Sequence, residues 1–260
     1  MSSEINNLKI NNSGIYIKNN LASVLERIHE AERRAGRSEG SVKLMAVSKF
    51  HSAEAVIEAY NARQRLFGEN RVQEACGKFP ALFEQFPDIE LHLIGSLQRN
   101  KVKQIIPYAS CIQSVDRIEL VDEIIKQCRK RSEEGEGDNG TTEKKTLKLL
   151  FEYHTGEESK SGFQSEDELL KAVEKAGEAS DCGIICSGFM TMAPFTDDKA
   201  VVRNSFKKLC AVAENVKKHF PSLPLDELSM GMSGDFEIAI EEGSTLVRVG
   251  TAIFGERNYA

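Results

Sequence analysis

The fold is decided by the stretch LDELSMGMSGDFEIAIEEGSTLVRVG, residues 225–250. Residues 225–230 predict a short strand, residues 233–243 predict a helix that ends at Gly243, and residues 244–250 predict another strand. Six strand-like runs precede this stretch, at residues 43–48, 65–67, 89–95, 109–115, 146–153 and 182–192. Helical repeats separate the runs, so the stretch completes a set of eight strands that alternate with helices.

Eight strands in alternation with helices are typical of a (β/α)8 barrel, also called a TIM barrel. The runs are apolar on both faces, as parallel strands covered by helices are. An open, doubly wound sheet has the same local pattern, and only the number eight favours a closed barrel. We therefore predict an α/β protein with the (β/α)8 fold.

The chain is predicted to be a single domain, residues 1–260, with some segments outside the barrel pattern. An extra N-terminal helix precedes the first strand, because Leu21, Val24 and Ile28 repeat at helical spacing. Residues 1–14 form a polar tail before it. Residues 130–145 lack apolar periodicity and predict a flexible loop insertion.

Composition argues against several functional classes. The formal net charge of −6 is unfavourable for a nucleic-acid or anionic-membrane partner. The N-terminus lacks the pattern of a secretory signal, and no apolar run is long enough to span a bilayer, so we expect a cytoplasmic protein. The six cysteines are scattered without a C-x-x-C pair, so we predict neither a metal site nor a disulfide scaffold.

Lys49 stands at the tip of the first strand, in the run KLMAVSKF, residues 43–50. Its ammonium group either leaves the core for water, as most lysines do, or faces a ligand. Ligands of (β/α)8 barrels bind at the C-terminal ends of the strands. The second interpretation therefore places an amine in the binding site.

The turns after the seventh and eighth strands have the composition of an anion site. SMGMSGD, residues 229–235, and RVGT, residues 248–251, combine glycines with hydroxyl side chains. We expect Ser233 to cap the following helix and to leave backbone N–H groups for a phosphate. The phosphate site of this fold is commonly built from these two loops. Ordinary turn formation explains the same residues equally well.

A lysine on strand one neighbours this phosphate cradle once the barrel closes. A ligand with an aldehyde at one end and a phosphate at the other fits both features, and pyridoxal 5'-phosphate has both groups. Arg248 would then lie near the pyridine nitrogen. Because a guanidinium does not accept a proton, the ring would stay unprotonated and be a weak electron sink.

Several stretches between residue 43 and the C-terminus carry a resemblance to a known family: AVSKFHSAE, FGENRVQE, LHLIGSLQRNK, QSVDR, ESKSGF, GFMTMAP and LSMGMSGDFEIAIEEGSTLVRVGTAIFGERNY. They resemble the pyridoxal phosphate homeostasis protein family, single-domain relatives of the alanine racemase barrel. The resemblance implies an alanine-racemase-like barrel that holds pyridoxal phosphate as a Schiff base on Lys49. It also implies a part in the intracellular homeostasis of this form of vitamin B6, with pyridoxal-phosphate-dependent apo-enzymes as recipients.

The resemblance implies roles for further residues. It places Arg248 beside the pyridine nitrogen, and it assigns the phosphate to Ser229, Gly250 and Thr251. The other residues that it places around the cofactor are Asn70, Met230, Gly231, Met232 and Ser233. One departure concerns FEYHTGEESKSGF, residues 151–163, which replaces a more usual apolar approach to the fifth loop.

Members of the broader racemase group need a second catalytic base, so its presence or absence distinguishes an enzyme from a carrier. In the resembled racemases this base is a tyrosine from a C-terminal β-domain across a dimer. The chain ends just after FGERNY, so we expect no such domain, no two-base racemisation and a monomer. A carrier without turnover is the leading interpretation. A racemase-like enzyme and a Schiff-base or phosphate-binding barrel aldolase are the alternatives.

Overall fold

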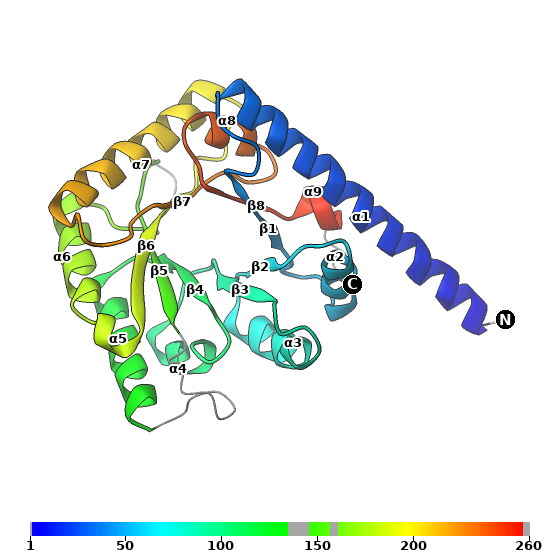
Figure 1. Cartoon of the computed structure of the whole chain (residues 1–260), viewed down its shortest axis with the longest axis horizontal. Helices are drawn as coiled ribbons and strands as arrows, with labels where there is room; N and C mark the ends of the chain where they lie inside the picture. Colours follow the sequence, from blue (N-terminus) through cyan, green and yellow to red (C-terminus); the bar gives the residue numbers. More distant parts are fainter. Residues whose placement is uncertain (1, 135–145, 157–160, 257–260) are drawn as a thin grey trace.

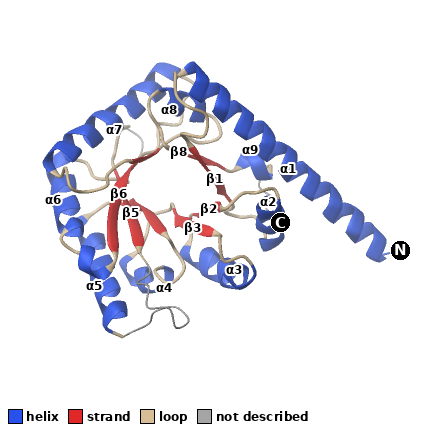
Figure 2. Ribbon diagram, viewed as in Figure 1, coloured by secondary structure: helices blue, strands red, loops and turns tan. Residues whose placement is uncertain are grey.

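A computed structural model describes residues 2–134, 146–156 and 161–256. Within these residues, eight parallel strands close into a barrel in the order β1-β2-β3-β4-β5-β6-β7-β8, which confirms the predicted fold. The strands are β1 (Lys43–Val47), β2 (Leu66–Glu69), β3 (Glu90–Leu93), β4 (Cys111–Val115), β5 (Leu147–Glu152), β6 (Ile184–Met190), β7 (Glu227–Ser229) and β8 (Leu246–Val249). Figure 2 shows the helices arranged around this ring of strands.

The helices follow the strands as the alternation predicts. They are α1 (Ser2–Arg34), α2 (Ala53–Asn61), α3 (Val72–Gln85), α4 (Val102–Ile105), α5 (Ile118–Glu133), α6 (Glu166–Gly177), α7 (Lys199–His219), α8 (Phe236–Glu241) and α9 (Thr251–Phe254), with short 3-10 turns at Arg99–Lys101 and Ser180–Cys182. The predicted loop 130–145 begins later than expected, because α5 continues to Glu133. Residues 135–145 of that loop lie outside the described residues.

Closure of the barrel depends on the pairing of the first strand with the last. Met45 on β1 is in parallel register with Arg248 on β8, and Ala46 with Val249. Alternate residues of each strand face opposite ways. Leu44 and Ala46 pack into the main core, which also contains the helix faces, whereas Met45, Val47 and Leu246 form a separate cluster inside the barrel. This inner face leads to the mouth of the barrel, where ligands bind.

Helix α1 is the extra N-terminal helix, and it begins at Ser2, so it includes residues that the sequence analysis assigns to a polar tail. It lies against α2, α8 and α9, as Figure 1 shows along the outside of the barrel. Asn20 Nδ2 donates to the Ile253 carbonyl at 2.8 Å, and Arg37 after the helix donates to the Ser244 carbonyl at 2.7 Å. The helix therefore covers the seam where β8 meets β1.

Two properties of the described residues bear on other functional classes. None of their helices is both long and apolar enough to cross a membrane. No group of three or more histidine, cysteine, aspartate or glutamate side chains among them has the arrangement of a metal site.

Candidate functional site

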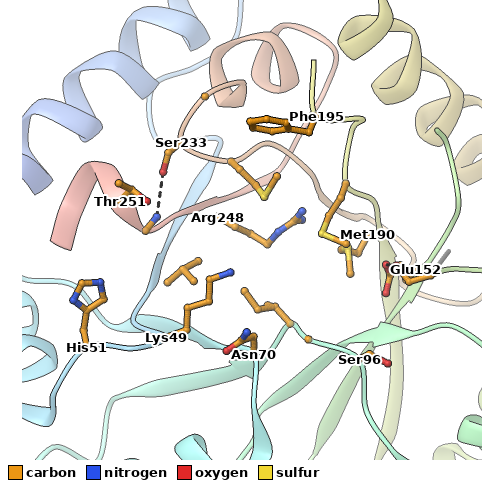
Figure 3. Close-up of a pocket in the computed structure, with 18 of the residues that line it drawn as sticks. Lys49, His51, Asn70, Ser96, Glu152, Met190, Phe195, Ser233, Arg248 and Thr251 are labelled. Carbon is orange, nitrogen blue, oxygen red and sulfur yellow. Dashed lines mark hydrogen bonds between the residues drawn. The ribbon is translucent and has the colours of Figure 1, made fainter. Parts of the chain in front are cut away.

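A pocket of about 580 Å³ opens at the C-terminal ends of the strands. Its lining residues are Val47, Lys49, His51, Asn70, Ile94, Gly95, Ser96, Glu152, Ser161, Met190, Met192, Phe195, Met232, Ser233, Gly234, Arg248, Gly250, Thr251 and Gly255. Figure 3 shows Lys49, Arg248, Ser233 and Thr251 around this space. The pocket therefore lies where the sequence analysis expected a ligand, at the C-terminal ends of the strands.

Strand alternation brings three charged side chains into the pocket. Met45 and Val47 of β1 face the barrel interior, and Lys49, two residues further on, points the same way. Arg248 of β8 shares the inward face of Leu246. Glu152 likewise follows the inner residue Leu150 on β5. An amine, a guanidinium and a carboxyl group therefore share one cavity.

The turn that carries Lys49 has an unusual backbone. Phe50 adopts a positive φ of 67°, which is unfavourable for a side chain other than glycine. The Phe50 N–H donates to Glu74 Oε1 at 2.6 Å, and the Arg71 guanidinium lies 5.2 Å from the centre of the Phe50 ring. These contacts hold the strained turn and so fix the direction in which Lys49 leaves β1.

Lys78 on α3 stabilises the same turn from below. Its ammonium group donates to the Ser48 carbonyl at 3.0 Å, to Glu69 Oε1 at 2.8 Å and to Glu74 Oε1 at 3.0 Å. The Glu69 side chain is completely buried. Burial raises the pKa of Glu69, while Lys78 and Ser48 lower it part of the way. Lys78 therefore joins the backbone before Lys49 to a buried carboxylate.

Arg248 is held by three hydrogen bonds inside the barrel. Its Nη1 donates to the Ser229 carbonyl at 2.7 Å and to Ser229 Oγ at 2.8 Å, and its Nη2 donates to the Thr191 carbonyl at 2.8 Å. Burial lowers the pKa of Arg248 to about 10, against the opposing effects of Asp235 and Glu152. The guanidinium therefore keeps its charge at neutral pH and has a fixed orientation.

The polar contacts of Arg248 continue across the barrel interior. Ser229 Oγ donates to Gln113 Oε1 at 2.7 Å, and Gln113 Nε2 donates to His92 Nδ1 at 2.8 Å. Burial lowers the pKa of His92 to about 3, so its ring is neutral at pH 7. Ser229, which the resemblance assigns to the phosphate, is buried, lies outside the pocket lining and accepts two hydrogen bonds from Arg248.

The expectation that Ser233 caps α8 is wrong. The helix begins at Phe236, after Asp235, and Asp235 Oδ1 accepts the Met232 N–H at 2.5 Å. Ser233 Oγ instead accepts a long hydrogen bond of 3.4 Å from the Gly250 N–H. This bond joins the turns after β7 and β8, so Met232, Ser233, Gly250 and Thr251 line the pocket together.

Two further residues of the SMGMSGD motif lie beside the pocket rather than on its surface. Met230 is completely buried in the main core. Gly231 has a φ of +96°, and a Cβ atom there would stand 2.6 Å from the Ala239 side chain. The Gly231 carbonyl accepts the Arg248 N–H at 2.9 Å. The positive φ and the close packing against α8 both require a glycine at this position.

Glu152 is a pocket residue that sequence reasoning missed. Its side chain is buried, and Ser161 Oγ donates to its Oε1 at 2.6 Å. Burial raises the pKa of Glu152, Ser161 and Arg248 lower it, and Asp116 raises it further. An acidic residue at the end of a mainly apolar strand, two positions after Leu150 and therefore on the same face, is the signal that could have identified it.

The pocket mouth contains a group of exposed apolar side chains, of which the sequence analysis identified Met232 but not Met192 or Phe195. Phe195, in the loop after β6, is 99% exposed, and Met192 from the same loop and Met232 from the loop after β7 are also exposed. All three side chains line the cavity. Figure 3 places the Phe195 ring above Arg248 at the edge of the pocket.

Similar proteins are known in both sequence and structure. The family described as "Alanine racemase, N-terminal domain" matches residues 20–258. A "Pyridoxal phosphate homeostasis protein" of Aquifex aeolicus is 40% identical over 240 residues, which cover 92% of this chain and 97% of that protein. An unknown protein from Bifidobacterium adolescentis has a crystal structure with a TM-score of 0.82 and 35% identity, over 93% of this chain and 96% of that chain.

PipY of Synechococcus elongatus, in a structure with PLP bound, is 33% identical with a TM-score of 0.75, over 92% of this chain and all of that chain. These similarities cover nearly the whole described barrel. The chain belongs to the pyridoxal phosphate homeostasis protein family, within the broader family of the alanine racemase N-terminal domain.

Proposed function

We propose that this chain binds pyridoxal 5'-phosphate at the mouth of the barrel and takes part in the homeostasis of that cofactor. One observation carries the proposal: Lys49, Arg248 and the turns at residues 232–234 and 250–251 line a single cavity. Their amine, guanidinium, hydroxyl and N–H groups are complementary to an aldehyde, a pyridine nitrogen and a phosphate. The names of its relatives and the PLP-bound structure of PipY support the same ligand.

Each group has a chemical reason for its role. Lys49 holds the cofactor covalently as a Schiff base with its aldehyde. Arg248 donates a hydrogen bond to the pyridine nitrogen. Ser233, Thr251 and the Gly250 N–H hold the phosphate, and a phosphate oxygen is a stronger acceptor for this N–H than Ser233 Oγ at 3.4 Å.

Arg248 favours storage of the cofactor over catalysis. Pyridoxal phosphate supplies an electron sink for carbanion chemistry, and that sink is strong only when the pyridine nitrogen carries a proton. With a pKa of about 10, the Arg248 guanidinium keeps its own protons at neutral pH and presents only donors. The pyridine nitrogen therefore stays unprotonated, which suits a carrier that holds the cofactor without turnover.

The test is the visible spectrum and the intact mass of the protein after incubation with pyridoxal phosphate, before and after borohydride treatment. We expect a yellow protein whose colour borohydride removes, with one cofactor fixed on the peptide that contains Lys49. Lys49→Ala abolishes both signals. Lys43→Gln is the matched control, because Lys43 begins β1 at the end opposite to the one that leads to Lys49, and this variant stays yellow.

Other outcomes select other functions. A colourless wild type, or a cofactor fixed on another lysine, contradicts the proposal. Racemisation of alanine above a protein-free blank would identify a racemase-like enzyme. Cleavage of a sugar phosphate by protein that has no colour would identify an aldolase.

The proposal extends to a monomer that acts in the cytoplasm and delivers its cofactor to pyridoxal-phosphate-dependent apo-enzymes. Delivery is measured as the reactivation of such an apo-enzyme by the loaded protein, compared with an equal concentration of free cofactor. Sedimentation equilibrium measures the oligomeric state. Faster reactivation than with free cofactor and the mass of a single chain are the expected results.

A further inference from the structure

Glu152 is a charged pocket side chain that the proposed function does not use. It lies on the inner face of β5, is 4% exposed and lines the same cavity as Lys49. Ser161 Oγ donates to its Oε1 at 2.6 Å. A carboxyl group is seldom buried beside a cavity unless it meets a partner there, because its desolvation is unfavourable. The position therefore indicates a ligand group.

The groups assigned to the cofactor come from one side of the barrel. Lys49, Arg248 and Gly250 follow or belong to β1 and β8, which pair with each other. Glu152 belongs to β5, which lies across the closed ring from β1. Figure 3 shows this separation, with Lys49 near the centre of the pocket and Glu152 at its far edge. The cavity therefore extends beyond the cofactor position to a second region.

The walls of the second region combine one carboxyl group with apolar side chains. Met190 and Met192 line it from β6 and the following loop, and Phe195 stands at its mouth. Methionine and phenylalanine side chains accommodate apolar groups of varied shape, and an aromatic face also attracts a cation. A small molecule with a cationic head and an apolar body matches this lining.

The charges around Glu152 favour a cation there once the cofactor is bound. A bound phosphate adds a charge of roughly −1.5 to −2 to the pocket. The positive groups are already engaged in the proposed function, because Lys49 holds the aldehyde and Arg248 faces the pyridine nitrogen. Burial raises the pKa of Glu152, Ser161 and Arg248 lower it, and Asp116 raises it further. Among the described lining residues, His51 at the cavity edge is the other titratable group besides Lys49 and Arg248. A cation in contact with the carboxyl group opposes the effect of burial on its pKa.

We propose that Glu152 and Ser161 form a subsite for the ammonium group of a primary amine with an apolar body. The amine enters past Phe195 and exchanges with Lys49 for the cofactor. The exchange and the charge argument rest on the proposed function, whereas the burial of Glu152 and the apolar lining around it do not, and amine binding at Glu152 is measured separately. The inference thus names the class of molecule that releases the cofactor from this chain.

The exchange balances in atoms and charge. The incoming ammonium group gives one proton to Glu152, and its nitrogen lone pair bonds to the cofactor carbon that Lys49 holds. The bond from this carbon to Lys49 Nζ then breaks. The three protons of the incoming ammonium group end on Nζ, and Glu152 returns the one that it carried.

The first test measures binding of benzylamine by calorimetry to full-length protein that has been incubated with pyridoxal phosphate and then treated with borohydride. Borohydride reduces the Schiff base, so the amine binds without exchange. We expect at least tenfold weaker binding of benzylamine to Glu152→Gln than to the wild type. Glutamine keeps the size of the side chain and its contact with Ser161 but removes the charge. Benzyl alcohol, which lacks the ammonium group, binds both proteins within twofold.

Equal affinity of the two proteins for benzylamine, or no binding to the wild type, overturns the subsite. This result is distinct from failure of the proposed function, in which the wild type acquires neither colour nor a fixed cofactor. The calorimetric comparison still decides the amine subsite in that case.

The second test follows the loss of colour when amines are added to the loaded, unreduced protein. Glu152→Gln slows exchange with benzylamine at least tenfold and exchange with hydroxylamine less than twofold, because hydroxylamine reacts as a neutral molecule at pH 7. An equal decrease for both reagents would show that the variant only distorts the pocket. An unchanged rate with benzylamine would exclude Glu152 from the exchange. Either result overturns the proposed role.

Discussion

The two sides of the pocket are held in different ways. On the side of β8, β1 and β2, Arg248 donates to three buried oxygen atoms, and Lys78 binds the turn that carries Lys49. On the side of β5 and β6, Glu152 accepts a hydrogen bond from a loop serine, and Phe195 is 99% exposed. We call the first the fixed side and the second the open side.

The difference separates two tasks of one cavity. Groups that are held in place before a ligand arrives lose little conformational freedom on binding, so they contribute fully to affinity. Exposed side chains adapt to ligands of different shapes at little cost to the fold. The fixed side therefore suits one cofactor, and the open side suits a variable amine. Substitutions on the two sides should differ accordingly in their effect on stability.

Lys78→Met should have the largest effect, because it leaves the buried Glu69 carboxylate without its ion partner. Removal of one partner from a buried ion pair costs about 3–5 kcal/mol of unfolding free energy. Urea denaturation at pH 8 measures this loss. It should be smaller at pH 5, because Glu69, whose pKa burial already raises, takes up a proton more readily there.

The matched control for this prediction is Lys78→Met combined with Glu69→Gln. The double variant has no uncompensated charge and should recover part of the lost stability. Like the single variant, it should load less pyridoxal phosphate than the wild type, because the Ser48 carbonyl lacks the donor that holds the turn in both. A double variant as unstable as the single one would show that the charge of Glu69 is not the cause.

Arg248→Leu should have the next largest effect. It leaves three buried oxygen atoms of Thr191 and Ser229 without a donor, at about 1 kcal/mol each, so we expect a loss of about 3 kcal/mol in urea denaturation. Affinity for pyridoxal phosphate should fall at least tenfold in a spectroscopic titration. Arg248→Lys keeps the charge but not the planar set of donors, and its intermediate affinity would separate the two contributions.

The fold and the main residues of the fixed side could be predicted from the sequence. The apolar runs, their number and the polar residues at their ends predicted the barrel and placed Lys49 and Arg248 at one rim. These features are local, because a strand and its phase can be read from a few neighbouring residues. The turns at Ser233 and Gly250 were recognised for the same reason.

The remainder depends on contacts between distant parts of the chain. Ser229 and Ser233 belong to one short motif, but only the structure shows that Ser229 meets Gln113 inside the barrel while Ser233 faces the pocket. To place Glu152 in the pocket, one must know which residues of β5 face the barrel interior, and no turn residue in the sequence indicates this. Phe195 belongs to a loop, where hydrophobic periodicity gives no information about direction.

His92→Gln sharpens the comparison on the fixed side, where His92 supports Arg248 through Gln113 and Ser229. The pKa of His92 is about 3 in the folded protein and 6.5 in its ordinary state, so the unfolded chain binds more protons between these values. The resulting stability is present above pH 6.5 and is lost as the pH falls towards 3. Between pH 7 and pH 5 the wild type should lose about 2 kcal/mol more than His92→Gln, which cannot titrate.

Urea denaturation of both proteins at the two pH values checks this difference. Parallel losses in the two proteins would mean that His92 becomes protonated in the folded state, and hence that the interior below Arg248 is wetter and less fixed than the contacts indicate. The spectrum of the bound cofactor provides a second measurement. It should keep its shape in His92→Gln, because glutamine can still accept the hydrogen bond from Gln113.

Phe195→Ala tests the open side and should have the smallest effect. Because the ring is 99% exposed, the unfolding free energy should change by less than about 0.5 kcal/mol. Loading with pyridoxal phosphate should match the wild type, while affinity for benzylamine falls by about 0.5–1 kcal/mol, or about two- to fivefold, because the amine loses its contact with the ring. Val201→Ala, an exposed site on α7 outside the pocket lining, is the control for removal of an exposed apolar side chain. A stability loss in Phe195→Ala comparable to that of Arg248→Leu would mean that the mouth is as firmly held as the opposite wall, and the distinction between the two sides would fail.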